Sequence, residues 1–172
     1  MSPELKPILE VSRLVKRFGG FTALDGLSFH VAGGEILGLV GPNGSGKTTA
    51  INVISGLYAP DGGELTFDGG AIGGVASHKL VHRGINRTFQ VPKPFMSLSV
   101  RENVEVALAY GRADGTPPSL DALLEEYRLA DVANRPTADL NSAQQKMLDL
   151  TRALATAPRL LLLDELAAGL NP

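Results

Sequence analysis

The sequence contains no cysteine among its 172 residues, so it can form neither a disulfide nor a thiolate metal site. Such a composition is typical of a cytosolic protein. Positive charge is also scarce, because 16 Lys and Arg stand against 18 Asp and Glu and form no basic tract. Since neutralising phosphates requires clustered Lys and Arg, we expect no nucleic acid as a partner.

No apolar run in the sequence has the length of a membrane span, and residues 1–7 lack the apolar core of a signal peptide. We therefore expect a cytoplasmic chain. The 20 glycines and 11 prolines separate patterned segments and form no low-complexity tract. The length is sufficient for one core of moderate size.

The most informative segment reads Gly41-Pro42-Asn43-Gly44-Ser45-Gly46-Lys47-Thr48-Thr49. It matches the phosphate-loop pattern, Gly-x-x-x-x-Gly-Lys followed by Ser or Thr. The segment 35–40 before it, apolar apart from Glu35 and Gly38, predicts a buried strand, and residues 48–55 after it predict a helix that ends at Gly56. The alternative, a glycine-rich turn that binds nothing, is disfavoured because strand, loop and helix occur in the required order.

The chemistry of such a loop follows from its backbone. Glycines allow the N–H groups to point inward, so a polyphosphate meets unshielded donors at the positive end of a helix. We expect Lys47 to reach the terminal phosphates and the Thr48 hydroxyl to bind Mg²⁺. The sequence therefore predicts a Mg-nucleotide site.

Apolar and polar residues alternate in residues 9–15, 27–31 and 64–67, which predicts strands with one solvated face. Phe18 and Phe21 come just after the first of these strands. A flat ring at this place would be able to stack on a purine base. From residue type alone, however, we interpret both phenylalanines as ordinary core residues.

Helical periodicity begins beyond residue 90. Residues 100–109 carry apolar side chains at helical spacing, and Ser119 is placed to cap a second helix. We interpret residues 91–141 as a helical insert in an α/β domain. The nucleotide-binding core then consists of residues 1–90 and residues 142–172.

The segment Asn141-Ser142-Ala143-Gln144 predicts the start of a further helix. Asn141 is followed three residues later by Gln144, which is the spacing of a capping box. In the helix that follows, we expect one buried face made of Met147, Leu150 and Leu154.

Residues 160–163 are four leucines, apolar on both faces as a strand inside a parallel sheet must be. Asp164 and Glu165 follow at the carboxyl end of this strand, where open α/β sheets bind their ligands. A carboxylate there is able to hold Mg²⁺, and the next one to deprotonate an attacking water. An acidic turn that only solvates the strand end would be the better interpretation if the phosphate loop were absent.

Taken together, these segments resemble the ATP-binding subunits of ABC transporters, and their residue sequences are most similar to those of the branched-chain amino acid importers. The resemblance covers essentially the whole chain and is least specific in the helical insert. The residues that carry it are Gly41–Thr49, Arg87-Thr88-Phe89-Gln90, Leu140–Lys146 and Leu160–Pro172.

The resemblance implies an α/β fold: a P-loop NTPase (RecA-like) core with antiparallel N-terminal strands and a helical insert. It also implies roles for single residues. Phe18, or with less support Phe21, would stack on adenine, against our interpretation from residue type. Gln90 would reach Mg²⁺ and water, Asp164 would hold the metal, and Glu165 would be the general base.

The resemblance further implies partners. In the family, two ATP-binding subunits enclose two ATP molecules head to tail, as homo- or heterodimers, and closure moves integral membrane permease subunits. A solute-binding protein takes part indirectly. The subunit is peripheral on the inner, cytoplasmic face of the plasma membrane, and the loop around Phe95 would face the permease.

The sequence departs from the family in its signature loop, which usually reads Leu-Ser-x-Gly-Gln and contacts the ATP of the other subunit. Here Asn141 replaces Ser and Ala143 replaces Gly, while Gln144 is kept. Asn141 is still able to cap the helix, but Ala143 would be strained at a positive φ. Leu166 also replaces the usual proline. We hypothesise that ATP is bound but that the closed dimer forms poorly.

The second departure is at the C-terminus, because family members continue for about seventy residues on typical domain sizes. The resemblance places there a histidine that contacts the γ-phosphate and a strand beside the phosphate-loop strand. Unpaired buried backbone groups cost about 1–3 kcal/mol each, against a domain stability of about 5–15 kcal/mol. We therefore expect a truncated chain of marginal stability, or one that obtains this strand from another polypeptide.

The function that follows is an ATP hydrolase subunit of an ABC importer for branched-chain or related amino acids. The alternative is a degenerate module that binds ATP without hydrolysing it and acts in regulation. The intact Lys47, Asp164 and Glu165 favour catalysis, whereas the changes at Asn141 and Ala143 favour the alternative.

Overall fold

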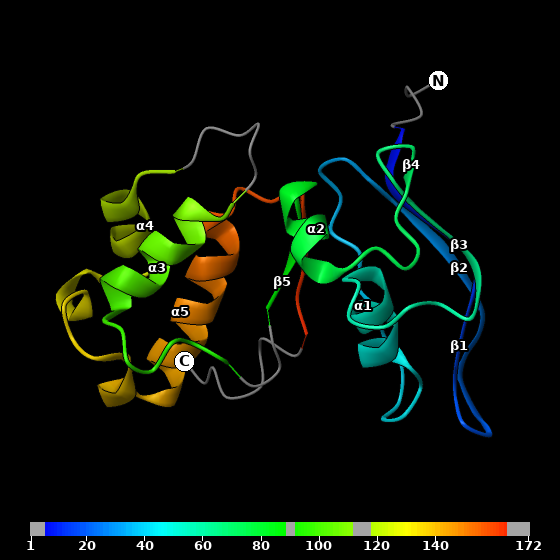
Figure 1. Cartoon of the computed structure of the whole chain (residues 1–172), viewed down its shortest axis with the longest axis horizontal. Helices are drawn as coiled ribbons and strands as arrows, with labels where there is room; N and C mark the ends of the chain where they lie inside the picture. Colours follow the sequence, from blue (N-terminus) through cyan, green and yellow to red (C-terminus); the bar gives the residue numbers. More distant parts are fainter. Residues whose placement is uncertain (1–5, 89–91, 112–117, 165–172) are drawn as a thin grey trace. The chain divides into compact units, whose positions relative to one another are not determined.

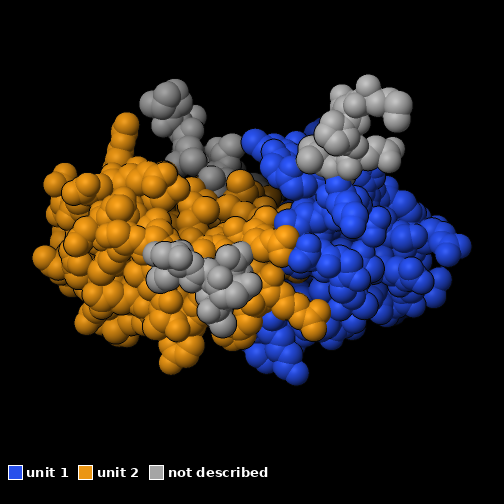
Figure 2. All heavy atoms as spheres, turned by 90° about the horizontal axis from the view of Figure 1, so that it is seen from above, with its two compact units in different colours: residues 1–80 blue, residues 81–172 orange. Residues whose placement is uncertain are grey.

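The computed structural model describes residues 6–88, 92–111 and 118–164. The chain divides into two compact units, residues 1–80 and residues 81–172, which Figure 2 shows in different colours.

The first unit contains an antiparallel sheet of four strands in the order β2-β1-β3-β4 (Figure 1). Its strands are β1 (Pro7–Phe18), β2 (Phe21–Ala32), β3 (Gly62–Phe67) and β4 (Gly70–Ala71). The alternation seen in the sequence buries Leu9, Val11 and Leu65 on one face. The three predicted N-terminal strands are confirmed.

Helix α1 (Lys47–Ile54) follows the phosphate loop, and the short helix α2 (Ser77–His82) follows β4. The apolar side of α1 is buried, and Gly56 follows its end at φ +72°. A Cβ on Gly56 would collide with the backbone carbonyl of Val75, so only glycine fits this helix terminus. The helix predicted for residues 48–55 is therefore confirmed to within one residue at each end.

The structure contradicts the prediction of a buried strand at residues 35–40. These residues form no strand, and the side chains of Ile36 and Val40 are 99% and 98% exposed. The physical reason is that an extended segment becomes a strand only when a neighbour takes up its N–H and C=O groups. No strand among the described residues pairs with this segment.

In the second unit, β5 (Ile85–Arg87) and β6 (Leu160–Leu162) form a parallel pair, as expected for the leucine-rich strand. Helices α3 (Val100–Ala109), α4 (Leu120–Glu126) and α5 (Ser142–Ala155) pack together with two short 3₁₀ helices, Ala130–Val132 and Thr137–Asp139. Their shared core includes Val100, Val104, Leu124, Leu129 and Leu148. The helix predicted for residues 100–109 is confirmed with the same bounds.

Two details of this unit differ from the predictions. Leu148 of α5 is fully buried, whereas Met147, Leu150 and Leu154 are only partly buried. The face of α5 is rotated because Leu148 enters the core formed with α3 and α4. Ser119 occupies the N-cap position of α4, but its side chain makes no capping hydrogen bond.

Candidate functional site

The phosphate loop meets α1 at Gly46, which has φ +93° and is the N-cap of the helix. Its carbonyl accepts a hydrogen bond from the Ala50 N–H at 2.8 Å. A Cβ on Gly46 would lie 2.6 Å from the carbonyl oxygen of Ala23 and 2.9 Å from Cδ2 of Leu24. Both the backbone angle and the close approach of β2 therefore require glycine here.

The rest of the loop curls tightly in front of the helix. The Ser45 N–H donates to the carbonyl of Pro42 at 3.2 Å, and Gly44 has φ +80°. A Cβ on Gly41 would lie 2.7 Å from Oγ of Ser45. Asn43 lies in this exposed turn.

Lys47 begins α1 and folds back over the loop. Its ammonium group donates hydrogen bonds of 2.8 Å to the carbonyls of Gly41 and Pro42. Thr48 and Thr49 lie beside it in the first turn of the helix. A positive charge, a helix N-terminus and a glycine-lined turn thus converge, and this donor set fits a polyphosphate.

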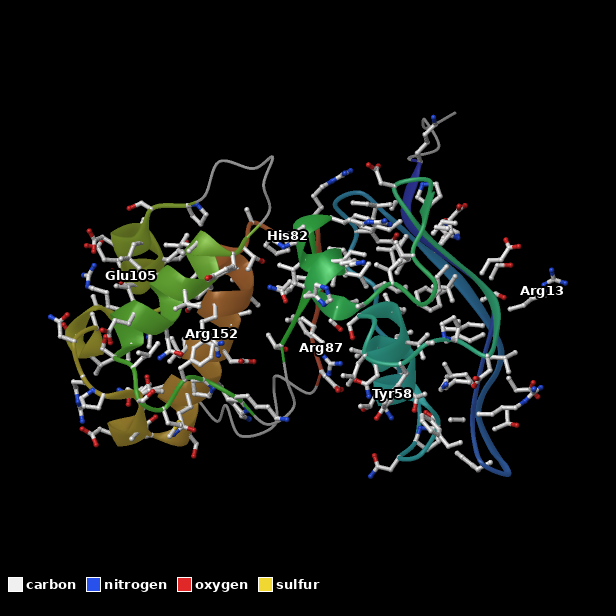
Figure 3. The ribbon with its side chains drawn as sticks, in the orientation of Figure 1. Arg13, Tyr58, His82, Arg87, Glu105 and Arg152 are labelled. Carbon is white, nitrogen blue, oxygen red and sulfur yellow. The ribbon has the colours of Figure 1, made fainter. Side chains whose placement is uncertain are left out.

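Phe18 and Phe21 flank the turn between β1 and β2 and are 43% and 63% exposed. The interpretation of these two residues as core is therefore wrong, because the end of the hairpin lies beyond the packed face of the sheet. The ring of Phe18 contacts Tyr58, whose label lies beside α1 in Figure 3. The ammonium group of Lys16 lies over the Phe18 ring, 5.4 Å from its centroid.

Asp164 follows β6 and is 5% exposed. Its carboxylate lies 3.7 Å from the guanidinium of Arg87 (labelled in Figure 3), at the end of the neighbouring strand β5. The Thr88 N–H extends this pairing by donating to the carbonyl of Leu162 at 3.0 Å. Asp164 thus occupies the carboxyl edge of a parallel pair, where the sequence predicted it. The contact with Arg87 was not predicted.

The capping box predicted at the start of α5 is confirmed. Oδ1 of Asn141 accepts from the Gln144 N–H at 2.9 Å, and the Gln144 side chain accepts from the Asn141 N–H at 3.1 Å. Ala143 lies in the first turn of this helix and is not among the residues with positive φ. The strain considered for Ala143 is therefore absent, because helical φ accommodates a Cβ.

The three metal ligands predicted from the sequence, Thr48, Gln90 and Asp164, are not all described within one unit of the structure. Thr48 belongs to the first unit and Asp164 to the second, while Gln90 lies outside the described residues. Glu165 and Leu166 also lie outside them. Within the described ranges, no three His, Asp or Glu side chains gather as a metal site. Joint metal binding by Thr48, Gln90 and Asp164 stays a prediction.

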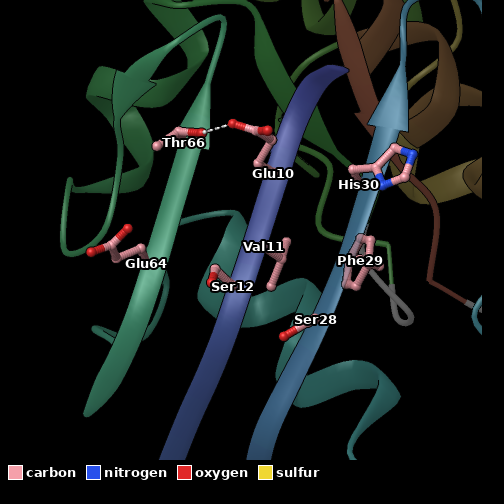
Figure 4. A pocket seen from close by; sticks show the side chains of 8 residues that line it. All are labelled: Glu10, Val11, Ser12, Ser28, Phe29, His30, Glu64 and Thr66. Atoms are coloured by element: carbon pink, nitrogen blue, oxygen red, sulfur yellow. Dashed lines mark hydrogen bonds between the residues drawn. The ribbon is translucent and has the colours of Figure 1, made fainter. Parts of the chain in front are cut away.

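A separate hollow of about 450 Å³ lies on the solvent-facing side of β1, β2 and β3 (Figure 4). One hydrogen bond crosses it, from the Thr66 hydroxyl to Glu10 at 3.1 Å. The phosphate loop takes no part in its lining, so the chemistry of the loop is not connected with this hollow. The lining residues are Glu10, Val11, Ser12, Ser28, Phe29, His30, Glu64 and Thr66.

Sequence reasoning missed Lys16 and Tyr58, which contact the ring of Phe18, and Asp61, which binds Lys16. Tyr58 and Asp61 are more than 40 residues from Lys16 and form no motif with it, so the contact of the segment before β3 with β1 brings them together. In the part of the chain that the structure describes, no helix has the length and hydropathy needed to cross a membrane.

Comparison with known proteins identifies the family. The ABC transporter family model matches residues 24–168. The branched-chain amino acid transport ATP-binding protein BraF of Pseudomonas aeruginosa is 39% identical, over 97% of this chain and 72% of its own length. A solved ATP-binding cassette of an ABC transporter is 35% identical with a TM-score of 0.82, over 96% of this chain and 72% of its own.

A second solved cassette is a dimer in a post-hydrolysis state with ADP and phosphate bound. It is 26% identical with a TM-score of 0.82, over 95% of this chain and 76% of its own. The resemblance inferred from the sequence and the P-loop NTPase fold with its N-terminal antiparallel sheet are thereby confirmed. This chain belongs to the ABC transporter family, as an ATP-binding subunit of the ABC-type ATPases related to those of branched-chain amino acid transporters.

Proposed function

We propose that the chain binds ATP with Mg²⁺ and couples its hydrolysis to the import of branched-chain or related amino acids. The observation that carries this proposal is the phosphate loop, in which Lys47 lies over the loop carbonyls in front of α1. On ATP binding, Lys47 turns from the carbonyls of Gly41 and Pro42 to the terminal phosphates, and the loop N–H groups bind the phosphate oxygens.

The adenine base stacks on Phe18, whose exposed ring lies in the same unit as the loop. Thr48, Gln90 and Asp164 are proposed as the Mg²⁺ ligands, because hydroxyl, amide and carboxylate oxygens are the donors that this hard cation prefers. When bound, Mg²⁺ supplies positive charge to the β- and γ-phosphate oxygens. Glu165 accepts the proton of the attacking water.

The partner for this chemistry is a second ATP-binding subunit, as in the dimeric cassette with ADP and phosphate bound. Asn141, Ala143 and Gln144 then approach the ATP held by that subunit. The likeness to BraF, a branched-chain amino acid transport ATP-binding protein, supports amino acid transport. Integral membrane permease subunits and, indirectly, a solute-binding protein are the further partners in this proposal. The chain acts from the cytoplasmic face of the plasma membrane.

The exposure of the segment around Phe95, which precedes α3, supports a contact of this segment with the permease. The side chains of Phe95 and Met96 are 46% and 49% exposed, and the guanidinium of Arg152 lies 4.9 Å from the centroid of the Phe95 ring. Two exposed apolar side chains, one of them stacked against a guanidinium group, are suited to bind an apolar segment of another protein.

A second candidate function is favoured by the start of α5. The Asn141 and Gln144 side chains are engaged in a reciprocal capping box, so they have fewer free groups for a phosphate. A chain that binds ATP without hydrolysing it would act in regulation.

The proposal is tested by ATP binding with Lys47→Ala, using the exposed Lys79→Ala on α2 as the matched control. Losing one charge-assisted contact of about 1.5–3 kcal/mol lowers ATP affinity about 10- to 100-fold. Lys79→Ala should leave it unchanged. Equal affinities for both variants would refute the proposed phosphate site.

Single-turnover hydrolysis then separates the two functions. A rate that falls about 100-fold or more in Glu165→Gln identifies an ATPase that uses this base. Tight ATP binding with no phosphate release in either form identifies the regulatory module.

A further inference from the structure

The exposed ring of Phe18 is held by two neighbours from different parts of the first unit. The Tyr58 ring meets it edge to face, with centroids 5.3 Å apart and planes 77° apart. The ammonium group of Lys16 lies over the ring of Phe18, 5.4 Å from its centroid. Both geometries are attractive, because ring edges and cations are drawn to the negative face of an aromatic ring.

Lys16 is itself fixed at several points. Its ammonium group donates to the carbonyl of Ala59 at 2.8 Å and lies 3.1 Å from the carboxylate of Asp61. Only 13% of its side chain is exposed, although it lies at the end of a hairpin. An anchored lysine of this kind restricts the ring that it covers.

Asp61 joins the segment that carries Tyr58 to β1, the strand that carries Lys16 and Phe18. Its carboxylate accepts from the Arg17 N–H at 2.6 Å, and its own N–H donates to the carbonyl of Val15 at 2.9 Å. The segment that carries Tyr58 is thereby tied to β1, which ends at Phe18. Phe18, Lys16, Tyr58 and Asp61 are called the ring frame below.

We infer that Lys16 and Tyr58 are positioning residues that hold Phe18 ready for a purine base. The inference rests on the proposed function. The ring is 43% exposed yet constrained, so the entropy cost of ordering it is met before the base arrives. Because Lys16 covers one face of the ring, the base stacks on the opposite face.

The inference predicts a different response for ligands with and without a base. ATP and inorganic tripolyphosphate both use the phosphate loop, but only ATP uses Phe18. Titration calorimetry of the full chain with each ligand, both with Mg²⁺, therefore separates the ring frame from the loop. The variants are Tyr58→Leu and Lys16→Met. Tyr58→Phe keeps the ring edge, and Tyr110→Leu is the control because Tyr110 is 71% exposed in the second unit.

Tyr58→Leu and Lys16→Met should each weaken ATP about 3- to 10-fold, the effect of losing one aromatic or cation contact. Tripolyphosphate affinity should stay unchanged, and Tyr58→Phe and Tyr110→Leu should bind ATP as the unaltered chain does. A role in folding alone would instead weaken both ligands together, which would overturn the inference.

The remaining outcomes separate this inference from the function on which it rests. If Phe18→Ala weakened ATP while Tyr58→Leu and Lys16→Met did not, the ring frame would be refuted and the phosphate site would stand. If the unaltered chain bound neither ATP nor tripolyphosphate, the proposed function would fall and the ring frame with it.

Discussion

Gly46 is the residue at which the phosphate loop tolerates substitution least. Alanine there must adopt φ +93°, which costs about 1–2 kcal/mol for a residue with a Cβ. The new Cβ would also lie 2.6 Å from the Ala23 carbonyl oxygen, so the loop and β2 have to move apart. We expect Gly46→Ala to lower the free energy of unfolding by about 3 kcal/mol, within the range of a severe substitution.

Two other glycines provide matched controls. Gly44 has φ +80° but no atom within 4 Å of its Cβ position, so Gly44→Ala should lose only the backbone term of about 1–2 kcal/mol. Gly20 has neither a positive φ nor a close neighbour, so Gly20→Ala should change stability by less than about 1 kcal/mol. Urea unfolding followed by circular dichroism measures all three. Equal stabilities for Gly46→Ala and Gly44→Ala would refute the argued close approach of β2.

Four further predictions concern other parts of the chain. Asn141→Ala should destabilise by about 1 kcal/mol in urea unfolding because the capping bond to Gln144 is lost, whereas Asn141→Ser should keep the cap. Asn141→Ser with Ala143→Gly should raise ATP-driven dimerisation measured by light scattering, and no change would mean that these positions are not limiting. Ile36→Ala should change the free energy of unfolding by less than about 0.5 kcal/mol because Ile36 is 99% exposed, whereas about 2–5 kcal/mol would show that it is buried in solution. The hydrogen bond from the Arg17 N–H lowers the pKa of Asp61 most, and the hydrogen bond from Lys16 lowers it further. The contribution of the Asp61 carboxylate to stability should therefore be complete above the ordinary aspartate pKa and disappear as the pH falls through the lowered value. Carboxyl NMR titration should show this shift, and an Asp61 that titrates at the ordinary aspartate pKa would contradict it.

The local elements were predictable because their causes are local. Alternation fixed the strands of the first unit, and the spacing of Asn141 and Gln144 specified a cap that the structure contains. The Gly-Lys-Thr run likewise predicted a helix from Thr48, one residue after the observed start of α1 at Lys47. Each of these features depends on residues within a few positions of one another.

The errors concern burial, which depends on distant segments. Residues 35–40 have the composition of an inner strand, but no described strand lies beside them. The buried face of α5 is set by α3 and α4, so the period of the helix did not reveal that Leu148 faces the core. Lys16 and Asp61 are 45 residues apart, and only strand pairing makes them neighbours.

The two carbonyl contacts of Lys47 have a consequence for turnover. Because Gly41 and Pro42 already accept two hydrogen bonds from the ammonium group, an arriving nucleotide replaces these acceptors and gains only the difference. The same carbonyls take the ammonium group back when the product leaves, so no bare charge is created on release. Acceptors within the loop therefore weaken the retention of the spent nucleotide, compared with a loop whose lysine lacks them.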